Sequence, residues 1–216
     1  MTYQAAIFDL DGTLLDTLED LWGSVNHTLR AHDMPERSRD DVRAFLGNGM
    51  RTLMHLSVPA GTSSEVEARL LAEFKEHYAV HSADHTAPYP QVVKLIEILA
   101  GEGVRRGVVS NKGDFAVQDL VERYFPRMFD VVVGERAGIR RKPAPDTVLA
   151  VTRKLSVGVN DVIYVGDSEV DLETAANVGC ACAAVSWGFR DRDFLVAHGA
   201  TLIADTTEEL AEAILM

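Results

Sequence analysis

The 216-residue sequence lacks the features that mark several classes of protein. No stretch approaches the ~18 consecutive apolar residues that a membrane-spanning helix requires. The N-terminus lacks the basic and apolar segments of a secretory signal peptide, because acid appears as early as Asp9. No internal repeat or low-complexity segment occurs. We therefore expect a cytoplasmic globular protein with no membrane partner.

Cysteine is scarce as well, since the sequence contains only Cys180 and Cys182. On a strand these two positions point the same way, because one residue, Ala181, separates them. No other metal-ligating side chain stands nearby in the sequence. We interpret both cysteines as small residues of the core rather than as a metal or redox site.

Positive charge is in short supply. The chain has 21 Lys and Arg residues against 33 Asp and Glu residues, which gives a formal net charge of −12. Such a charge repels polyanions, so we expect no nucleic-acid partner. If the substrate is an anion, a local cationic pocket has to bind it.

What the sequence does contain is an alternation of strand and helix patterns from about residue 104 onward. Short apolar or β-branched runs predict strands in "VRRGVVSN", "FDVVVG", "DVIYVGD", "ACAAVSWG" and "ATLIAD". A 3.6-residue apolar period predicts helices in "DFAVQDLVERYF", "APDTVLAVTRKL", "EVDLETAANVG" and "EELAEAIL". This alternation predicts an α/β fold, a Rossmann-like parallel sheet with helices on both faces, and "QAAIF" adds a further strand.

Residues 16–86 differ, because they show helical patterns and no convincing strand. The helical stretches are "TLEDLWGSVNHTLRAH", "SRDDVRAFLGNGMRTLMHL" and "SSEVEARLLAEFKEHYAVH". Pro88 and Pro90 then interrupt the chain before the helical "QVVKLIEILAGEG". We predict an α/β core of residues 1–15 and 87–216, with a small all-helical domain of residues 16–86 inserted after the first strand.

Polar residues follow three of the predicted strands. Asp9 and Asp11 follow the first strand, Ser110 and Asn111 end another, and Asp167 follows a third. A turn or a helix cap explains each cluster alone, but not their coincidence. By average residue usage, a chance Asp-x-Asp-Gly-Thr in such a chain has a probability on the order of a percent or less. Since parallel sheets bind ligands beyond the carboxyl ends of their strands, we predict a site there.

Paired carboxylates determine the chemistry that this site can perform. Ionising both Asp9 and Asp11 costs free energy because the two charges repel each other. A cation between them removes this cost, and otherwise one of them keeps its proton. Asp167 and Asp171 add acid at the same edge, and such an oxygen-rich site suits Mg²⁺. Asp9 can then attack phosphorus as a nucleophile. Asp11 can protonate the leaving oxygen and later accept a proton from water.

A lysine has to assist the metal. The electrostatic repulsion between a phosphate dianion and one carboxylate ~4 Å away is roughly 8 kcal/mol at an effective dielectric constant of ~20, and positive charge has to offset it. Lys142 in "RRKPAPD" is the best candidate, and a solvated surface lysine is the alternative. Ser110 and Asn111 would donate hydrogen bonds to phosphate oxygens. Thr13 either does the same or orients the aspartates.

These motifs resemble those of the haloacid dehalogenase-like superfamily of phosphatases. "DLDGTLLDT" resembles its first motif, "VVSNK" its second, "RRKPAPD" its third and "YVGDSEVDLETAANVG" its fourth, in matching order and spacing over the whole chain. The resemblance implies that Asp9 is nucleophile and metal ligand. It also implies that Asp11 is the general acid/base and that its backbone carbonyl binds Mg²⁺.

The remaining site residues follow from the same resemblance. It implies that Ser110 and Lys142 hold the phosphate and that Asp167 ligates the metal. Asp171 is expected to support the metal shell or Lys142. The helical insertion corresponds to a cap domain, which would open to admit substrate and close to exclude water.

The branch of the superfamily can be narrowed further. Asp11 argues against the dehalogenase and phosphonatase branches, which lack this second aspartate, and Leu21 stands where the β-phosphoglucomutase branch has histidine. "RAFLGNGMRTLM" and "AVSWGF…HGATLIADTTEEL" are similar to phosphoglycolate phosphatases. The resemblance implies hydrolysis of 2-phosphoglycolate to glycolate and phosphate. Open alternatives are other phosphatases (of sugar phosphates, pyrophosphate or nucleotides), a phosphomutase, and a non-catalytic binding protein on the same fold.

Two features of the helical insertion have alternative interpretations. "FLGNGMRT" predicts a specificity loop in which Arg51 binds a substrate carboxylate, or else a plain turn with a solvated arginine. His77, His81 and His85 recur every four residues and would share a face of a continuous helix. That pattern favours a partly exposed helix face over a metal site. The sequence is equally compatible with a monomer and a homodimer.

Overall fold

A computed structural model describes residues 3–216 of the chain. The chain is divided into two compact units. The first comprises the residues up to Leu15 and those from Pro88 onward, and the second comprises Asp16–Ala87. The short strands β2 (Leu15–Asp16) and β3 (Ala87–Pro88) pair where the chain passes from one unit to the other. No described helix is both long enough and apolar enough to cross a membrane.

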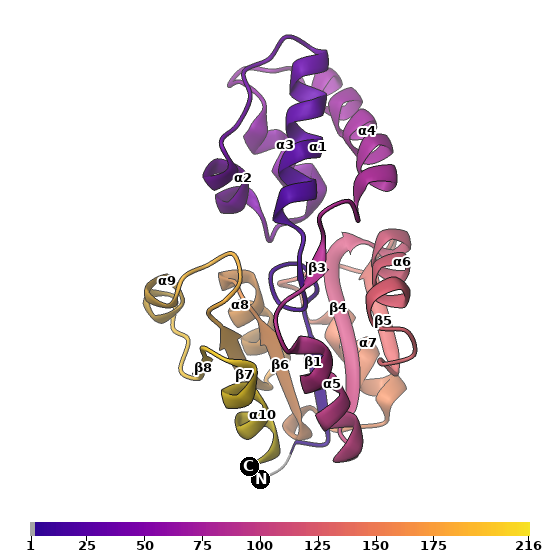
Figure 1. Cartoon of the computed structure of the whole chain (residues 1–216), viewed down its shortest axis with the longest axis vertical. Coiled ribbons are helices and arrows are strands. Elements are labelled where there is room, and N and C mark those ends of the chain that lie inside the picture. Colours follow the sequence, from indigo (N-terminus) through magenta and orange to yellow (C-terminus); the bar gives the residue numbers. More distant parts are fainter. Residues whose placement is uncertain (1–2) are drawn as a thin grey trace. The chain divides into compact units, whose positions relative to one another are not determined.

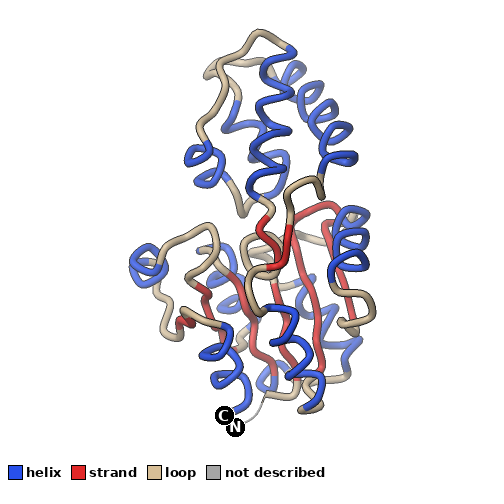
Figure 2. Tube along the Cα trace, in the orientation of Figure 1, coloured by secondary structure: helices blue, strands red, loops and turns tan. Residues whose placement is uncertain are grey.

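A six-stranded parallel sheet lies at the centre of the first unit, within the described residues (Figures 1 and 2). Its strand order is β5-β4-β1-β6-β7-β8. The strands are β1 (Ala5–Phe8), β4 (Arg105–Gly113), β5 (Val131–Glu135), β6 (Val162–Gly166), β7 (Ala181–Val185) and β8 (Ile203–Ala204). Phe8 is in register with Val108 on one side and Val165 on the other. The residues that follow β1, β4 and β6 therefore meet at one edge of the sheet.

Helices cover both faces of this sheet, as Figure 1 shows. One face carries α5 (Val92–Gly101), α6 (Asp114–Tyr124) and α10 (Thr207–Leu215), and the other carries α7 (Asp146–Leu155) and α8 (Glu169–Val178). A 3₁₀ turn (Val159–Asp161) precedes β6. The prediction of an α/β fold with a parallel sheet and helices on both faces is confirmed.

Helix α9 (Arg192–Ala197) was not predicted from the sequence. Its six residues are too few to show a helical period of apolar side chains. The Asp191 carboxylate caps it by accepting a hydrogen bond from the Phe194 N–H.

The core of the first unit is built on apolar strands buried on both faces. Side chains of β1, β6 and α7 form one cluster, which includes Ile7, Tyr164 and Val151. Cys180 and Cys182 pack against this cluster and are half-buried. Burial raises the pKa of the Cys180 thiol to about 11, so that it stays protonated at neutral pH and is a poor metal ligand.

The second unit is built from α1 (Leu18–Ala31), α2 (Arg39–Phe45), α3 (Gly49–Ser57) and α4 (Ser64–His81). Helices α1 and α4 pack together and bury Leu21, Val25, Leu29, Leu70, Phe74 and Tyr78. The helical pattern over residues 38–56 is divided into α2 and α3 at Gly47, whose φ of +110° lies outside helical space.

Helix α4 does not continue through His85. It ends at His81, because the buried Asp20 carboxylate of α1 binds the chain that follows. The backbone N–H groups of His85 and Thr86 donate to Asp20 oxygens at 2.8–3.1 Å. His85 therefore leaves the helical face that His77 and His81 share.

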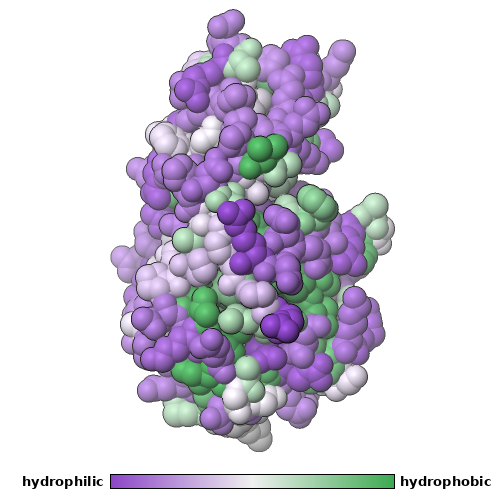
Figure 3. All heavy atoms as spheres, turned by 45° about the vertical axis from the view of Figure 1, so that its right-hand side comes forward, coloured by the Kyte–Doolittle hydropathy of each residue, from purple (hydrophilic) through white to green (hydrophobic). Residues whose placement is uncertain are grey.

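The surface is predominantly hydrophilic on the face that Figure 3 shows, where hydrophobic areas are small and separate. Some large apolar side chains are exposed, among them Phe115 and Val80, at 82% and 75% of their full accessible area. Single exposed apolar residues of this kind are ordinary.

Candidate active site

The loop after β1 brings the first two aspartates to the edge of the sheet. The Asp9 backbone N–H donates to the Val165 carbonyl at 2.9 Å, so Asp9 still belongs to the sheet while its side chain stands at the strand end. The chain then turns through Gly12, whose φ is +84°. A Cβ atom built at Gly12 would lie 2.3 Å from an Asp167 carboxylate oxygen. Glycine is thus required for the turn to approach Asp167.

Lys142 lies among the acids and is 2% exposed. Its Nζ is 2.9 Å from Asp9 Oδ2 and 2.8 Å from Asp171 Oδ1. It also donates to the Tyr164 hydroxyl at 3.0 Å. The interpretation of Lys142 as a solvated surface lysine is therefore excluded.

The buried charges of this cluster act on one another. Burial alone would lower the pKa of Lys142, but the carboxylates of Asp171 and Asp9 outweigh it and raise that pKa well above its ordinary value. Burial raises the pKa of Asp9 to about 7, against the attraction of Lys142. Lys142 is thus a permanent cation, whereas Asp9 gives up its proton near neutral pH.

Asp167 is held from two sides. The Thr13 hydroxyl donates to its Oδ1 at 3.0 Å, and the Phe189 N–H donates to its Oδ2 at 2.8 Å. Burial raises the pKa of Asp167 well above the usual range, and the nearby acids Asp171 and Asp9 add to the rise. Of the two roles weighed for Thr13, this geometry corresponds to orienting an aspartate.

The donor set fits a hard divalent cation. Asp9, Asp167 and Asp171 each offer a carboxylate oxygen, and these oxygens all lie within 4.8 Å of one another. Both oxygens of Asp171 already have donors, since Oδ1 accepts from Lys142 and Tyr164 and Oδ2 accepts from the N–H and hydroxyl of Ser168. Each oxygen of Asp9 and Asp167 has one such contact, with the Leu10 N–H and Lys142 for Asp9 and with Thr13 and Phe189 for Asp167. Each Asp171 oxygen has two, so Asp9 and Asp167 keep more capacity for a metal, and Asp171 contacts Lys142.

The end of β4 contributes a lysine that the sequence analysis missed. Lys112 is buried, and its Nζ donates to Asp11 Oδ1 at 2.6 Å. Its backbone N–H donates to the Ser110 hydroxyl at 3.1 Å. The signal was available, because Lys112 stands in the "VVSNK" motif, two residues beyond the serine chosen as a phosphate ligand.

Asn111 holds the backbone of the Lys142 segment, because its Nδ2 donates to the Lys142 carbonyl at 3.1 Å. Tyr164, which touches both Lys142 and Asp171, was also missed. No local signal distinguishes it from its apolar neighbours in β6. Trp187 is half-buried and donates its indole N–H to the Thr13 carbonyl at 3.1 Å.

Arg51 belongs to the second unit. It lies in the first turn of α3 and is exposed, so it is part of a helix and not of a loop.

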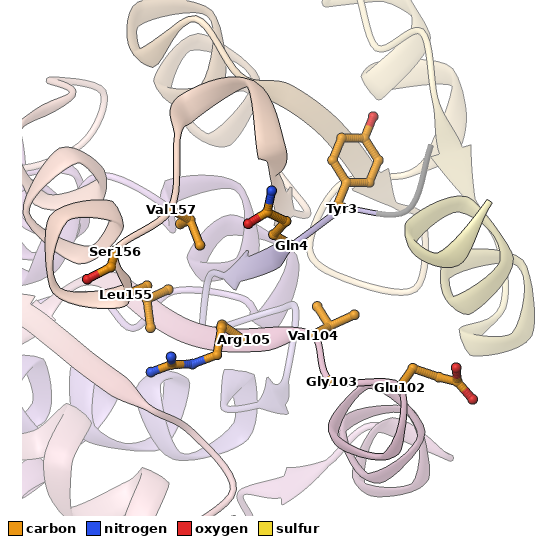
Figure 4. A pocket seen from close by; sticks show the side chains of 9 residues that line it. All are labelled: Tyr3, Gln4, Glu102, Gly103, Val104, Arg105, Leu155, Ser156 and Val157. Atoms are coloured by element: carbon orange, nitrogen blue, oxygen red, sulfur yellow. The ribbon is translucent and has the colours of Figure 1, made fainter.

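A cavity of about 500 Å³ lies at the other edge of the sheet (Figure 4). Gln4, which precedes β1, and Arg105, which begins β4, are among its lining residues. The close-up shows one carboxylate, that of Glu102, and no cluster of acids. The chemistry predicted from the sequence therefore belongs to the opposite edge, where Asp9 and Asp167 stand.

Comparison with known proteins identifies relatives over nearly the whole chain. A family model described as haloacid dehalogenase-like hydrolase matches residues 6–185, which include all the acids and lysines above. A phosphoglycolate phosphatase of Mesorhizobium japonicum is 30% identical over 99% of this chain and 99% of its own. An N-acetylmuramic acid 6-phosphate phosphatase of Pseudomonas aeruginosa is 29% identical over 99% of this chain and 96% of its own.

A solved structure agrees over the full length. It is a protein of Lactobacillus delbrueckii subsp. bulgaricus, assigned by prediction to the phosphoglycolate phosphatases. It superposes with a TM-score of 0.95 at 39% identity and covers 100% of this chain and 99% of its own. Sequence and fold point to the same group of proteins.

Proposed function

Because the chain belongs to the haloacid dehalogenase-like hydrolase family, we propose that it is a Mg²⁺-dependent phosphatase of a small-molecule phosphate monoester. The observation that carries the proposal is the contact of Asp9 with the buried cation Lys142, beside the second carboxylate Asp167. This arrangement presents a nucleophilic oxygen next to positive charge that can attract a phosphate.

Mg²⁺ would be held by the carboxylates of Asp9 and Asp167 and by the backbone carbonyl of Asp11. When bound, it would neutralise negative charge on the acids and on the phosphate. Carboxylate and carbonyl oxygens are the ligands that this ion prefers, together with water and substrate phosphate. The raised pKa values of Asp9 and Asp167 support this assignment, because burial, with a smaller contribution from neighbouring acids, disfavours their charged forms, and a bound cation would relieve that cost.

The reaction has two steps. In the first, a carboxylate oxygen of Asp9 bonds to phosphorus while the ester P–O bond breaks, and Asp11 gives its proton to the leaving oxygen. In the second, water attacks phosphorus, Asp11 takes the proton from that water, and the aspartyl-phosphate bond breaks. Inorganic phosphate leaves and both aspartates return to their starting states.

The neighbouring side chains bind and orient. Lys142 would attract the phosphate oxygens, and the Ser110 hydroxyl would donate to one of them, since it accepts from the Lys112 N–H and keeps its own proton for a ligand. Asn111 would act through the Lys142 segment, and Thr13 through Asp167. These contacts keep the reacting groups in place without further reorganisation.

The substrate that we propose is 2-phosphoglycolate. The named substrates of the two relatives, phosphoglycolate and N-acetylmuramic acid 6-phosphate, are both phosphate monoesters that carry a carboxylate. The guanidinium of Arg51 would bind the carboxylate of the substrate. Phosphatases of sugar phosphates, pyrophosphate or nucleotides share this layout and remain the alternatives, ahead of a phosphomutase or a non-catalytic binding protein.

A panel of phosphate esters tests the proposal. It would include 2-phosphoglycolate, N-acetylmuramic acid 6-phosphate, a neutral sugar phosphate, pyrophosphate and a nucleotide, each assayed with Mg²⁺ and with EDTA. We expect phosphate release to depend on the metal and 2-phosphoglycolate to give the highest kcat/KM. Preference for another ester would overturn the substrate assignment, and turnover in metal-stripped protein would overturn the metal assignment.

A further inference from the structure

Three histidines of the second unit stack across two helices. His27 comes from α1, and His77 and His81 come from α4. The ring centroids of His27 and His77 are 3.8 Å apart, and those of His77 and His81 are 4.3 Å apart. The function proposed above uses none of them.

The stack borders a cavity of about 230 Å³. Most of its polar lining is histidine or acid, since His27, His77, His81 and His85 occur there with Glu19, Asp20 and Asp84. The cation that lines it is Arg30, which lies 3.7 Å from Glu36 in an exposed ion pair. The site thus offers several nitrogen ligands and a net negative charge, which favours a cation over an anion.

In two of these rings, the Nδ1 nitrogen lies within hydrogen-bonding distance of a side-chain oxygen. His81 Nδ1 lies 2.7 Å from an Asp84 carboxylate oxygen, and His77 Nδ1 lies 3.0 Å from the Ser24 hydroxyl. When the Asp84 carboxylate accepts from His81 Nδ1–H, the Nε2 lone pair of that ring is left as the ligand atom. Burial, and then the nearby His27 and His81, lower the pKa of His77, so that its ring is neutral at neutral pH.

We propose that this cavity binds a divalent transition-metal ion of the Zn²⁺, Ni²⁺ or Cu²⁺ class, with His77 and His81 as its first ligands and His27 as the third. Two histidines four residues apart on one helix face hold zinc in known motifs. Imidazole suits these ions, whereas the carboxylates of the first unit suit Mg²⁺. The two sites therefore differ in the metal that they select.

Binding has to open the stack. Within residues 3–216, Asp9, Asp167 and Asp171 form the group of three ligand side chains whose atoms already lie within 4.8 Å of one another. The imidazoles must turn so that their Nε2 atoms converge on the ion. His27 is exposed and the His81 side chain is 46% exposed, so neither ring is enclosed in the core between α1 and α4.

The proposal is tested by titrating Zn²⁺ into the Asp9→Asn/Asp167→Asn double variant and measuring the heat of binding by calorimetry. The titration is done at pH 7.5 with excess Mg²⁺. These substitutions remove the acidic site of the first unit as a competing zinc ligand. We expect one equivalent of Zn²⁺ to bind, and His77→Gln or His81→Gln to weaken binding at least about tenfold. The matched control is His55→Gln, because His55 is an exposed histidine of the same unit that lies beside Glu67 instead.

A second readout keeps the proposal falsifiable if a variant is unstable. In ¹⁵N NMR of the unsubstituted chain, Zn²⁺ should shift the Nε2 resonances of His77 and His81 and leave those of His55 and His198 unchanged. No zinc binding up to millimolar concentration, or equal binding in His77→Gln, His81→Gln and His55→Gln, would overturn the proposal. Neither readout depends on phosphatase activity. The zinc-site proposal can therefore fail while the proposed function stands, or stand while the proposed function fails.

Discussion

Lys112 and Asp11 form an ion pair at the edge of the sheet, with Lys112 Nζ 2.6 Å from Asp11 Oδ1. The lysine side chain is 3% exposed and the aspartate side chain 19%. The contact joins the last residues of β4 to the loop after β1, and it fixes the carboxylate that we propose as general acid and base. Lys112 also adds a second buried positive charge to a site rich in acids.

Lys112→Met should lower kcat by about 10- to 100-fold, with a smaller effect on KM. The variant keeps the aliphatic stem but removes the ammonium group that contacts Asp11. Positioned acid–base groups contribute about 10²–10⁴-fold. Steady-state kinetics should show a larger loss for alkyl phosphates than for p-nitrophenyl phosphate, whose leaving group needs less protonation. The control is Lys94→Met at an exposed position of α5. Equal losses for the two ester types would contradict a positioning role.

Mg²⁺ affinity should fall as the pH is lowered through neutrality. Asp9 has a pKa of about 7 without metal, so below that pH the ion has to displace a proton. The dissociation constant, measured by calorimetry, should rise at least about tenfold per pH unit below 7, because Asp9 and, at lower pH, Asp167 have to lose a proton to bind the ion. The raised pKa of Asp9 also affects the stability of the metal-free protein. Its contribution to the free energy of unfolding is fully present below pH 3.8, the ordinary pKa of the group, and is lost as the pH rises toward 7. A dissociation constant that is independent of pH between 5 and 8 would contradict the assignment of Asp9 as a ligand.

Gly12→Ala should abolish activity and weaken Mg²⁺ binding. The added methyl group would meet Asp167 at a φ of +84°, and the shift needed would move a metal ligand. Gly23→Ala is the matched control, because Gly23 lies in α1 and a Cβ atom there meets nothing within 4 Å. Its thermal unfolding should show a small gain in stability, of about 0.5–1 kcal/mol. Full activity of Gly12→Ala would show that the turn tolerates a side chain.

Arg51→Ala should raise KM for 2-phosphoglycolate about 10-fold or more, since a charge-assisted pair contributes about 1.5–3 kcal/mol. KM for an ester with a neutral tail should change little. The comparison separates recognition of the carboxylate from a general effect on the fold. Equal changes in both values would rule out the carboxylate contact.

Much of the fold followed from the sequence because the relevant signals are local. Apolar runs ending in "FDLDGT" and "YVGD" predicted strands, and the rule that parallel strands present their carboxyl ends together brought Asp9 and Asp167 to one edge. Helix α9 was not predicted, because six residues are too few to show a helical period of apolar side chains.

Other parts of the site depend on distances that no local pattern encodes. The partner of Lys112 is a residue 101 positions away, and the partner of Thr13 is 154 positions away. His27 joins His77 only because α1 packs on α4. Sequence patterns predicted which side chains reach the edge of the sheet, but the pairing of donors with acceptors required the tertiary structure.

The central claim is that Asp9 becomes phosphorylated, and mass spectrometry of acid-quenched protein tests it directly. After brief mixing with Mg²⁺ and 2-phosphoglycolate, the peptide that contains Asp9 should carry one phosphoryl group, and Asp9→Asn should show neither the adduct nor turnover. Asp9→Asn protein that remains folded and hydrolyses the ester at the unsubstituted rate would contradict the account.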